Sequence, residues 1–117
     1  ELRGRAATLQ MAITALQQME DTVLAKLARG QNPGPNSSLL KLLSSNLGQS
    51  LAALKMSTLA YYAVPNNNLL MRLGEPGIGT QAASTATAIY LNNRASTIFG
   101  GSNEVQKNII AKTVLGL

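Results

Sequence analysis

Two long stretches of this chain carry apolar residues at every third or fourth position, and a segment rich in Pro and Gly separates them. In the first stretch, residues 3–29, the repeat is formed by Leu9, Ile13, Leu16, Val23 and Leu27. In the second, residues 35–62, it is formed by Leu39, Leu43, Leu47, Leu51 and Leu54. This spacing is typical of amphipathic α-helices with about 3.6 residues per turn. Because the connector "GQNPGPN" cannot continue a helix, the sequence predicts two long helices that fold back on one another.

The rest of the chain predicts two shorter helices and no convincing strand. Residues 80–93 are rich in Ala and Thr, and residues 103–115 carry apolar side chains at helical spacing. A long connector, "AVPNNNLLMRLGEPGIG", precedes the third helix. The predicted fold is all-α, an antiparallel up-and-down four-helix bundle that forms one domain over residues 1–117. Gly48, inside the second helix, predicts a close contact with a neighbouring helix. The uncapped helical pattern at the first residue suggests a fragment of a longer chain.

Composition excludes several classes of chemistry. The chain has no Cys and no His, so it offers no thiol nucleophile, no imidazole base and no His/Cys metal site. Its five carboxylates are scattered, which argues against an oxygen-ligand metal site. The net charge of +5 is spread along the chain, as on a solvated surface or around an anionic partner. With one Phe and no basic stripe, nucleic-acid binding is a poor hypothesis. No apolar run reaches the roughly 18 residues of a membrane span.

The most unusual local feature is "GGSNE", residues 100–104, which precedes the last predicted helix and which we call the glycine corner. Adjacent glycines before a helix form either an ordinary turn or an anion site in which backbone N–H groups face a ligand. The P-loop pattern is absent, because no Lys follows at the required position and no strand precedes. Glu104 is open to two interpretations as well. It is either part of a functional site at this turn or an ordinary acidic residue of a first helical turn, which complements the helix dipole.

The tail "YLNNRASTIFGGSNEVQKNIIAKTVLGL" resembles the C-terminal end of the acyl-CoA dehydrogenases, which typically read "TIYGGTSEIQ", then a basic residue, "NIIA" and "LGL". The earlier "GQNPGPNSSLLKLLSSNLGQSL" is similar to a segment of many bacterial members, in which "PGPEAS" precedes "LLK". The resemblance covers nearly the whole chain and is weakest over residues 64–80. It implies that residues 1–117 are the C-terminal helical bundle, without the N-terminal helical domain and the middle β-domain.

The resemblance also implies a function for the complete protein. Members of the family hold FAD and oxidise an acyl-CoA thioester to the 2,3-enoyl-CoA, and their electrons leave to an electron-transfer flavoprotein. The C-terminal bundle builds the dimer and tetramer interface, in a homo- or hetero-oligomer, and its last helix begins against the FAD adenosine and pyrophosphate. The expected location is the bacterial cytoplasm. On this view the 117-residue chain alone is inactive, because most of the flavin site lies elsewhere.

Carried over residue by residue, the resemblance assigns the glycine corner to FAD. Ser102 and Glu104 match the family's Thr and Glu or Gln that contact the cofactor. Gly101 and Asn103 offer backbone beside them. Amides and a hydroxyl suit a polar, anionic cofactor, and a glycine removes a Cβ from its path.

Two departures from the family pattern limit what can be assigned. Gly100 occupies a position at which some members carry the catalytic Glu, so the base is not there, and no catalytic residue is assigned. Other members hold the base on an earlier helix, outside this chain, and some subunits of heteromeric enzymes lack it. The usual "QxxGGxGY" segment is also missing, and Gln81 in "GEPGIGTQAAS" is therefore left unassigned. The alternative hypothesis is a non-catalytic helical oligomerisation subunit of a heteromeric acyl-CoA dehydrogenase-like complex.

Overall fold

The computed structural model describes residues 1–67, 70, 72–75, 77 and 79–116, and within these residues every regular element is helical. In chain order the elements are α1 (Leu2–Ala28), α2 (Asn36–Leu59), the 3-10 helix η1 (Ala60–Ala63), α4 (Gln81–Ser84), α5 (Ala86–Asn92), the 3-10 helix η2 (Asn93–Thr97) and α6 (Asn103–Leu115). Residues 68, 69, 71, 76 and 78 of the predicted connector, and residue 117 of the tail motif, lie outside the described part.

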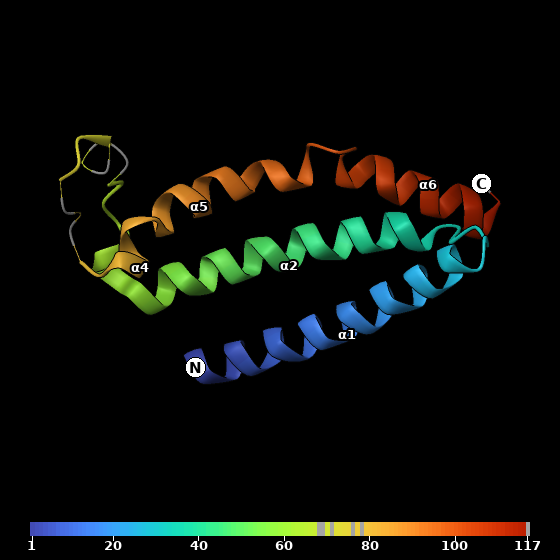
Figure 1. The fold of residues 1–117 in the computed structure, drawn as a ribbon, viewed down its shortest axis with the longest axis horizontal. Coiled ribbons are helices and arrows are strands. Elements are labelled where there is room, and N and C mark those ends of the chain that lie inside the picture. Colours follow the sequence, from blue (N-terminus) through green and yellow to red (C-terminus); the bar gives the residue numbers. More distant parts are fainter. Residues whose placement is uncertain (68–69, 71, 76, 78, 117) are drawn as a thin grey trace.

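Helix α2 is the centre of the arrangement (Figure 1). Helix α1 runs antiparallel to it along one side, and α5, η2 and α6 follow one another along another side. The chain therefore runs up, down and up again: α1 forms the first pass, α2 the second, and α5, η2 and α6 together form the third pass. The predicted all-α fold with two long and two shorter helices is confirmed.

The predicted helix bounds agree best where the local signals are strongest. The first and fourth predicted helices match α1 and α6 to within a residue or two. The second ends early, because Ala60 adopts a positive φ of 48° that breaks the α-helical hydrogen bonding before η1. The third is interrupted at Thr85, between α4 and α5. Two residues further on, inside α5, the Thr87 hydroxyl donates to the Ala63 carbonyl oxygen and ties α5 to η1.

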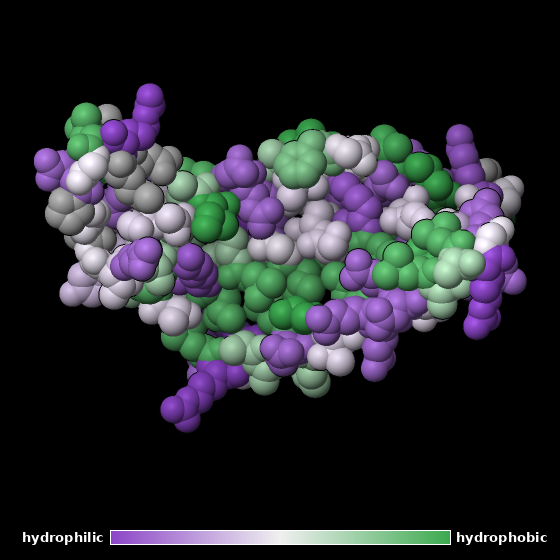
Figure 2. Space-filling model, viewed as in Figure 1, coloured by the Kyte–Doolittle hydropathy of each residue, from purple (hydrophilic) through white to green (hydrophobic). Residues whose placement is uncertain are grey.

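The core is thin and is built from small side chains. Among the described residues, the buried apolar ones are Val23, Ala52, Ala63, Ala83 and Ala86. The radius of gyration is 17.9 Å, whereas a compact domain of this length would have about 13 Å. Apolar side chains gather in an open seam between α1 and α2 (Figure 2). Many large apolar side chains of this helical layer are thus exposed. None of the helices in the described ranges has the length and hydropathy needed to cross a bilayer.

Candidate functional site

The glycine corner lies between η2 and α6 and depends on the backbone freedom of its two glycines. Gly100 has a φ of +67° and Gly101 a φ of +87°, and L-residues with a Cβ rarely adopt such backbone angles. An added Cβ at Gly100 would meet nothing within 4 Å, whereas one at Gly101 would come 2.5 Å from Nε2 of Gln106. Both glycines are exposed. The backbone itself therefore requires glycine here, and the turn leaves its outer surface open.

Ser102 begins α6 as its N-cap. Its Oγ accepts a hydrogen bond of 3.3 Å from the backbone N–H of Val105, and its carbonyl oxygen accepts one of 3.0 Å from the N–H of Gln106. An N-cap oxygen satisfies one of the N–H groups that have no partner within the helix. The hydroxyl predicted to contact a cofactor thus already has a local structural role.

Glu104 follows in the first turn of α6, and its side chain is exposed. A hydrogen bond from its own backbone N–H lowers the pKa of this carboxyl, and a hydrogen bond from the Ser102 side chain lowers it further. The nearby charges of Lys107 and Lys41 act in the same direction. The glycine corner therefore carries a negative charge at neutral pH, beside the positive end of the helix dipole.

Asn103 differs from its neighbours, because its side chain turns inward and is 6% exposed. Its Oδ1 accepts hydrogen bonds of 3.1 Å from Lys41 Nζ and from Ser45 Oγ. Its Nδ2 donates to Oδ1 of Asn46, also at 3.1 Å. Sequence reasoning assigned only the backbone of Asn103 and missed this contact. The available signal was the cluster of polar residues 41, 45 and 46 on an otherwise leucine-rich helix.

The structure places three of the four predicted cofactor-binding residues, Gly101, Ser102 and Glu104, in one turn together with Gly100, and it directs the fourth, Asn103, toward α2. The turn offers backbone N–H groups at the start of a 13-residue helix, a hydroxyl and an ionised carboxylate. Gln81 lies in α4, beside the C-terminal end of α2 and away from the start of α6 (Figure 1). The geometry thus gives no reason to add Gln81 to the site.

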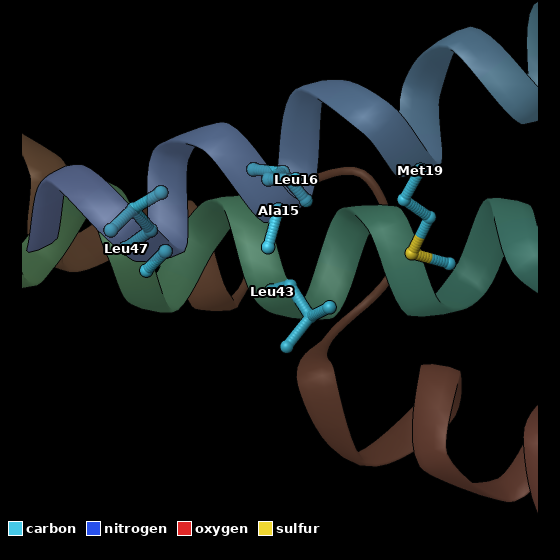
Figure 3. A pocket seen from close by; sticks show the side chains of 6 residues that line it. Ala15, Leu16, Met19, Leu43 and Leu47 are labelled. Carbon is cyan, nitrogen blue, oxygen red and sulfur yellow. The ribbon is translucent and has the colours of Figure 1, made fainter. Parts of the chain in front are cut away.

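A separate apolar groove lies between α1 and α2 (Figure 3). It encloses about 310 Å³ and is lined by Ala12, Ala15, Leu16, Met19, Leu43 and Leu47. These six side chains hold no acid, base or nucleophile. The groove is therefore a packing surface and contributes no reactive group.

Comparison with known proteins decides the family. The protein-family model of the acyl-CoA dehydrogenase C-terminal domain matches residues 1–115 of the sequence. The chain belongs to this domain family. The resemblance noted in the tail motif is thereby confirmed, and it extends over α1 and α2 as well.

Two mycobacterial proteins are similar to the chain. The acyl-CoA dehydrogenase IpdE1 of Mycobacterium tuberculosis is 34% identical over 113 residues, which cover 93% of this chain and 26% of that protein. The acyl-CoA dehydrogenase IpdE1 of Mycolicibacterium smegmatis is 69% identical over 29 residues, 25% of this chain and 7% of that protein. The chain thus spans about a quarter of the length of its M. tuberculosis relative. No solved structure is a significant match.

Proposed function

We propose that this domain is part of an FAD-dependent acyl-CoA dehydrogenase that oxidises an acyl-CoA to the 2,3-enoyl-CoA, and that its glycine corner contacts the FAD adenosine and pyrophosphate. The observation that carries the proposal is the exposed turn itself. It presents Gly100 and Gly101 in left-handed backbone conformations, directly before a capped helix start, within the tail sequence typical of the family. An ordinary turn between helices does not need two adjacent glycines in left-handed conformations.

The residues of the glycine corner fit an anionic, polar cofactor. The N-terminal N–H groups of α6 favour a phosphate, and a ligand can approach the backbone at Gly100, where an added Cβ would meet nothing within 4 Å. The Glu104 carboxylate would repel a phosphate, so it is suited to the hydrogen-bond donors of a ribose or an adenine. When bound, the flavin accepts the hydride that leaves the acyl chain. In this chain the corner residues hold and orient the other end of the cofactor.

The base that removes the α-proton does not come from the glycine corner. Gly100 has no side chain to accept a proton. Glu104 is exposed and its pKa is lowered, whereas a general base works best when its pKa lies near the operating pH. We therefore assign no catalytic residue here and expect the carboxylate base in a part of the protein beyond residues 1–117.

The open apolar surfaces support a second role in assembly. Tyr61, Ile98 and Phe99 are 91%, 70% and 61% exposed, and apolar side chains also line the seam between α1 and α2. Exposed apolar areas of this kind mark surfaces that other protein covers. We propose that the domain contributes to a homo- or hetero-oligomer interface.

We further propose that the complete protein is a cytoplasmic enzyme of a bacterium, because the two relatives named above are bacterial proteins. We propose that it passes its electrons to an electron-transfer flavoprotein.

One observation favours a different function. Because Gly100 stands where some members carry the catalytic Glu, the protein could belong to a heteromeric complex as its non-catalytic helical subunit. In that case a partner subunit supplies the base, and this domain supplies the interface. The two hypotheses differ in whether the complete protein reacts with acyl-CoA by itself.

The test is to purify the complete protein and record its visible absorption before and after anaerobic addition of a series of acyl-CoA thioesters. A bound flavin that is bleached by an acyl-CoA, with matching reduction of an artificial electron acceptor, is the expected result. Flavin binding and bleaching only after co-expression with a partner subunit would favour the heteromeric alternative. A colourless protein in both preparations would overturn the proposal.

A further inference from the structure

The start of α6 is fastened to α2 by one buried carboxamide. Asn103 accepts hydrogen bonds from Lys41 and Ser45 and donates one to Asn46, each at 3.1 Å. The Oγ of Ser45, which is 7% exposed, also lies 2.9 Å from the carbonyl oxygen of Lys41, so its single proton is shared between this oxygen and Asn103 Oδ1. All three partners belong to the N-terminal half of α2. We call Asn103 with these three partners the Asn103 clamp.

The clamp restricts the direction in which α6 begins. Its hydrogen bonds connect the second residue after the glycine pair to a rigid helix, immediately behind the exposed turn. A buried carboxamide that loses its partners is strongly disfavoured, so the first turn of α6 cannot rotate or shift without breaking several bonds at once. The backbone N–H groups and the Glu104 carboxylate move with that turn. Their outward direction is thus fixed from the inside by Asn103.

Lys41 extends the clamp beyond α2. With Leu16 and Glu20 of α1 it lines a cavity of about 320 Å³ between α1 and α2, while its Nζ reaches Asn103 on α6. Its charge also contributes to the lowered pKa of Glu104. One side chain thus joins the α1–α2 seam to the glycine corner, and it places a positive charge close to the turn.

We infer that Asn103 and Lys41 are positioning residues for FAD: the Asn103 clamp holds the glycine corner in the orientation that receives the cofactor. This inference rests on the proposed function. It assigns the Asn103 side chain a task distinct from the backbone contact expected at that position. The family pattern quoted above has Ser at the position of Asn103.

The experiment measures FAD binding to the complete apoprotein by flavin fluorescence, together with the apoprotein's thermal unfolding midpoint. Asn103→Leu keeps the number and branching of the heavy atoms, in a somewhat larger side chain, and removes all three hydrogen bonds. The matched control is Gln49→Leu, because Gln49 is another carboxamide that ties α2 to the third pass. Its Nε2 donates to the carbonyl oxygens of Asn93 and Arg94 at 3.2 and 3.3 Å, away from the glycine corner.

The expected result is an FAD dissociation constant raised about tenfold in Asn103→Leu and less than about twofold in Gln49→Leu, with similar losses of thermal stability. Equal changes in FAD affinity in the two variants, or an unchanged affinity in Asn103→Leu, would show that the clamp only supports the fold and would overturn the inference. If Asn103→Leu does not fold, Lys41→Met decides, because it removes one donor and keeps the aliphatic stem. The FAD affinity of Lys41→Met is expected to fall about threefold. An unchanged FAD affinity in this variant would contradict the inference.

The wild-type arm separates this inference from the proposed function. If the wild-type apoprotein binds FAD, only the comparison between variants is at issue. If it binds none, the proposed function fails first, and the positioning role is overturned with it.

Discussion

A Cβ built on Gly48 of α2 would lie 3.2 Å from Nδ2 of Asn93, the first residue of η2. Such a separation is tighter than most contacts of real Cβ atoms, so a side chain at Gly48 would have to displace Asn93. Next to it, Gln49 donates to the carbonyl oxygen of Asn93 at 3.2 Å. The close helix contact predicted from Gly48 is confirmed.

The first prediction follows from this contact. Gly48→Leu is expected to destabilise the folded protein by about 2 kcal/mol, because the added side chain forces α2 and η2 apart. The measurement is the thermal unfolding midpoint. The matched control is Gly4→Leu in α1, where an added Cβ meets nothing within 4 Å and the better helix former is expected to be neutral or stabilising. Equal unfolding midpoints in the two variants would contradict the prediction.

The parts of the fold that follow from short-range signals could be predicted from the sequence. Helices α1 and α6 carry an apolar period along their length, and α6 also carries a capping residue and a glycine stop. Both are present as predicted. The break between α4 and α5 was not predicted, because the composition of residues 80–93 indicates one continuous helix; the nearby bond from Thr87 to Ala63 joins residues 24 positions apart and has no local signal either.

The candidate site also has a part that could be predicted from local sequence and a part that could not. The cap at Ser102 and the left-handed glycines are local features, so the sequence of the glycine corner was enough to indicate a turn before the last helix. The Asn103 clamp depends on residues that lie 62, 58 and 57 positions away in the chain. Helical periodicity does not specify which polar side chains of two distant helices face one another. That pairing is set by the register of α6 on α2.

A second prediction concerns the backbone of Gly101. Gly101→Ala is expected to destabilise the folded state by about 1–2 kcal/mol, because its φ of +87° disfavours a residue with a Cβ. The contact with Gln106 adds to this effect. In the double variant Gly101→Ala, Gln106→Ala the contact is relieved, and the backbone strain stays. Chemical denaturation of the single and double variants would separate the two contributions, and wild-type stability in Gly101→Ala would contradict the prediction.

Ser102 permits a third prediction that separates capping from cofactor binding. Ser102→Ala is expected to cost about 1 kcal/mol through the lost cap, whereas Ser102→Asp keeps a cap oxygen and holds the stability near that of the wild type. Asp also adds a negative charge where the proposal has the pyrophosphate. The flavin content of the purified complete protein is therefore expected to fall in Ser102→Asp even though the fold is retained. Wild-type flavin content in this variant would reduce Ser102 to a helix cap.

The lowered pKa of Glu104 gives a fourth prediction, about acid stability. Its folded-state pKa lies below the ordinary value of 4.5, so the ionised carboxylate stabilises the folded state fully above that pH. This contribution is lost as the pH falls through the lowered pKa. Glu104→Gln is therefore expected to be less stable than the wild type at pH 7 and to approach it in acid.

Salt provides the control for the Glu104 experiment. The largest cause of the lowered pKa is the hydrogen bond from the residue's own backbone N–H, and the lysine charges act less strongly. High salt screens exposed charges and leaves such a hydrogen bond in place. The difference between wild type and Glu104→Gln is expected to persist at high salt, and its disappearance would assign the effect to Lys107 and Lys41.

The fifth prediction concerns the 117-residue chain by itself. The glycine corner offers one exposed edge to a cofactor, and the groove between α1 and α2 holds no polar group that could bind a flavin ring. The separate domain is therefore expected to purify without colour and to reduce no artificial acceptor with any acyl-CoA, while the complete protein prepared alongside it is yellow. Absorption spectra of the two preparations provide the measurement. Stoichiometric flavin in the separate domain would mean that residues 1–117 form a complete binding site, in conflict with the open, one-sided corner that the structure shows.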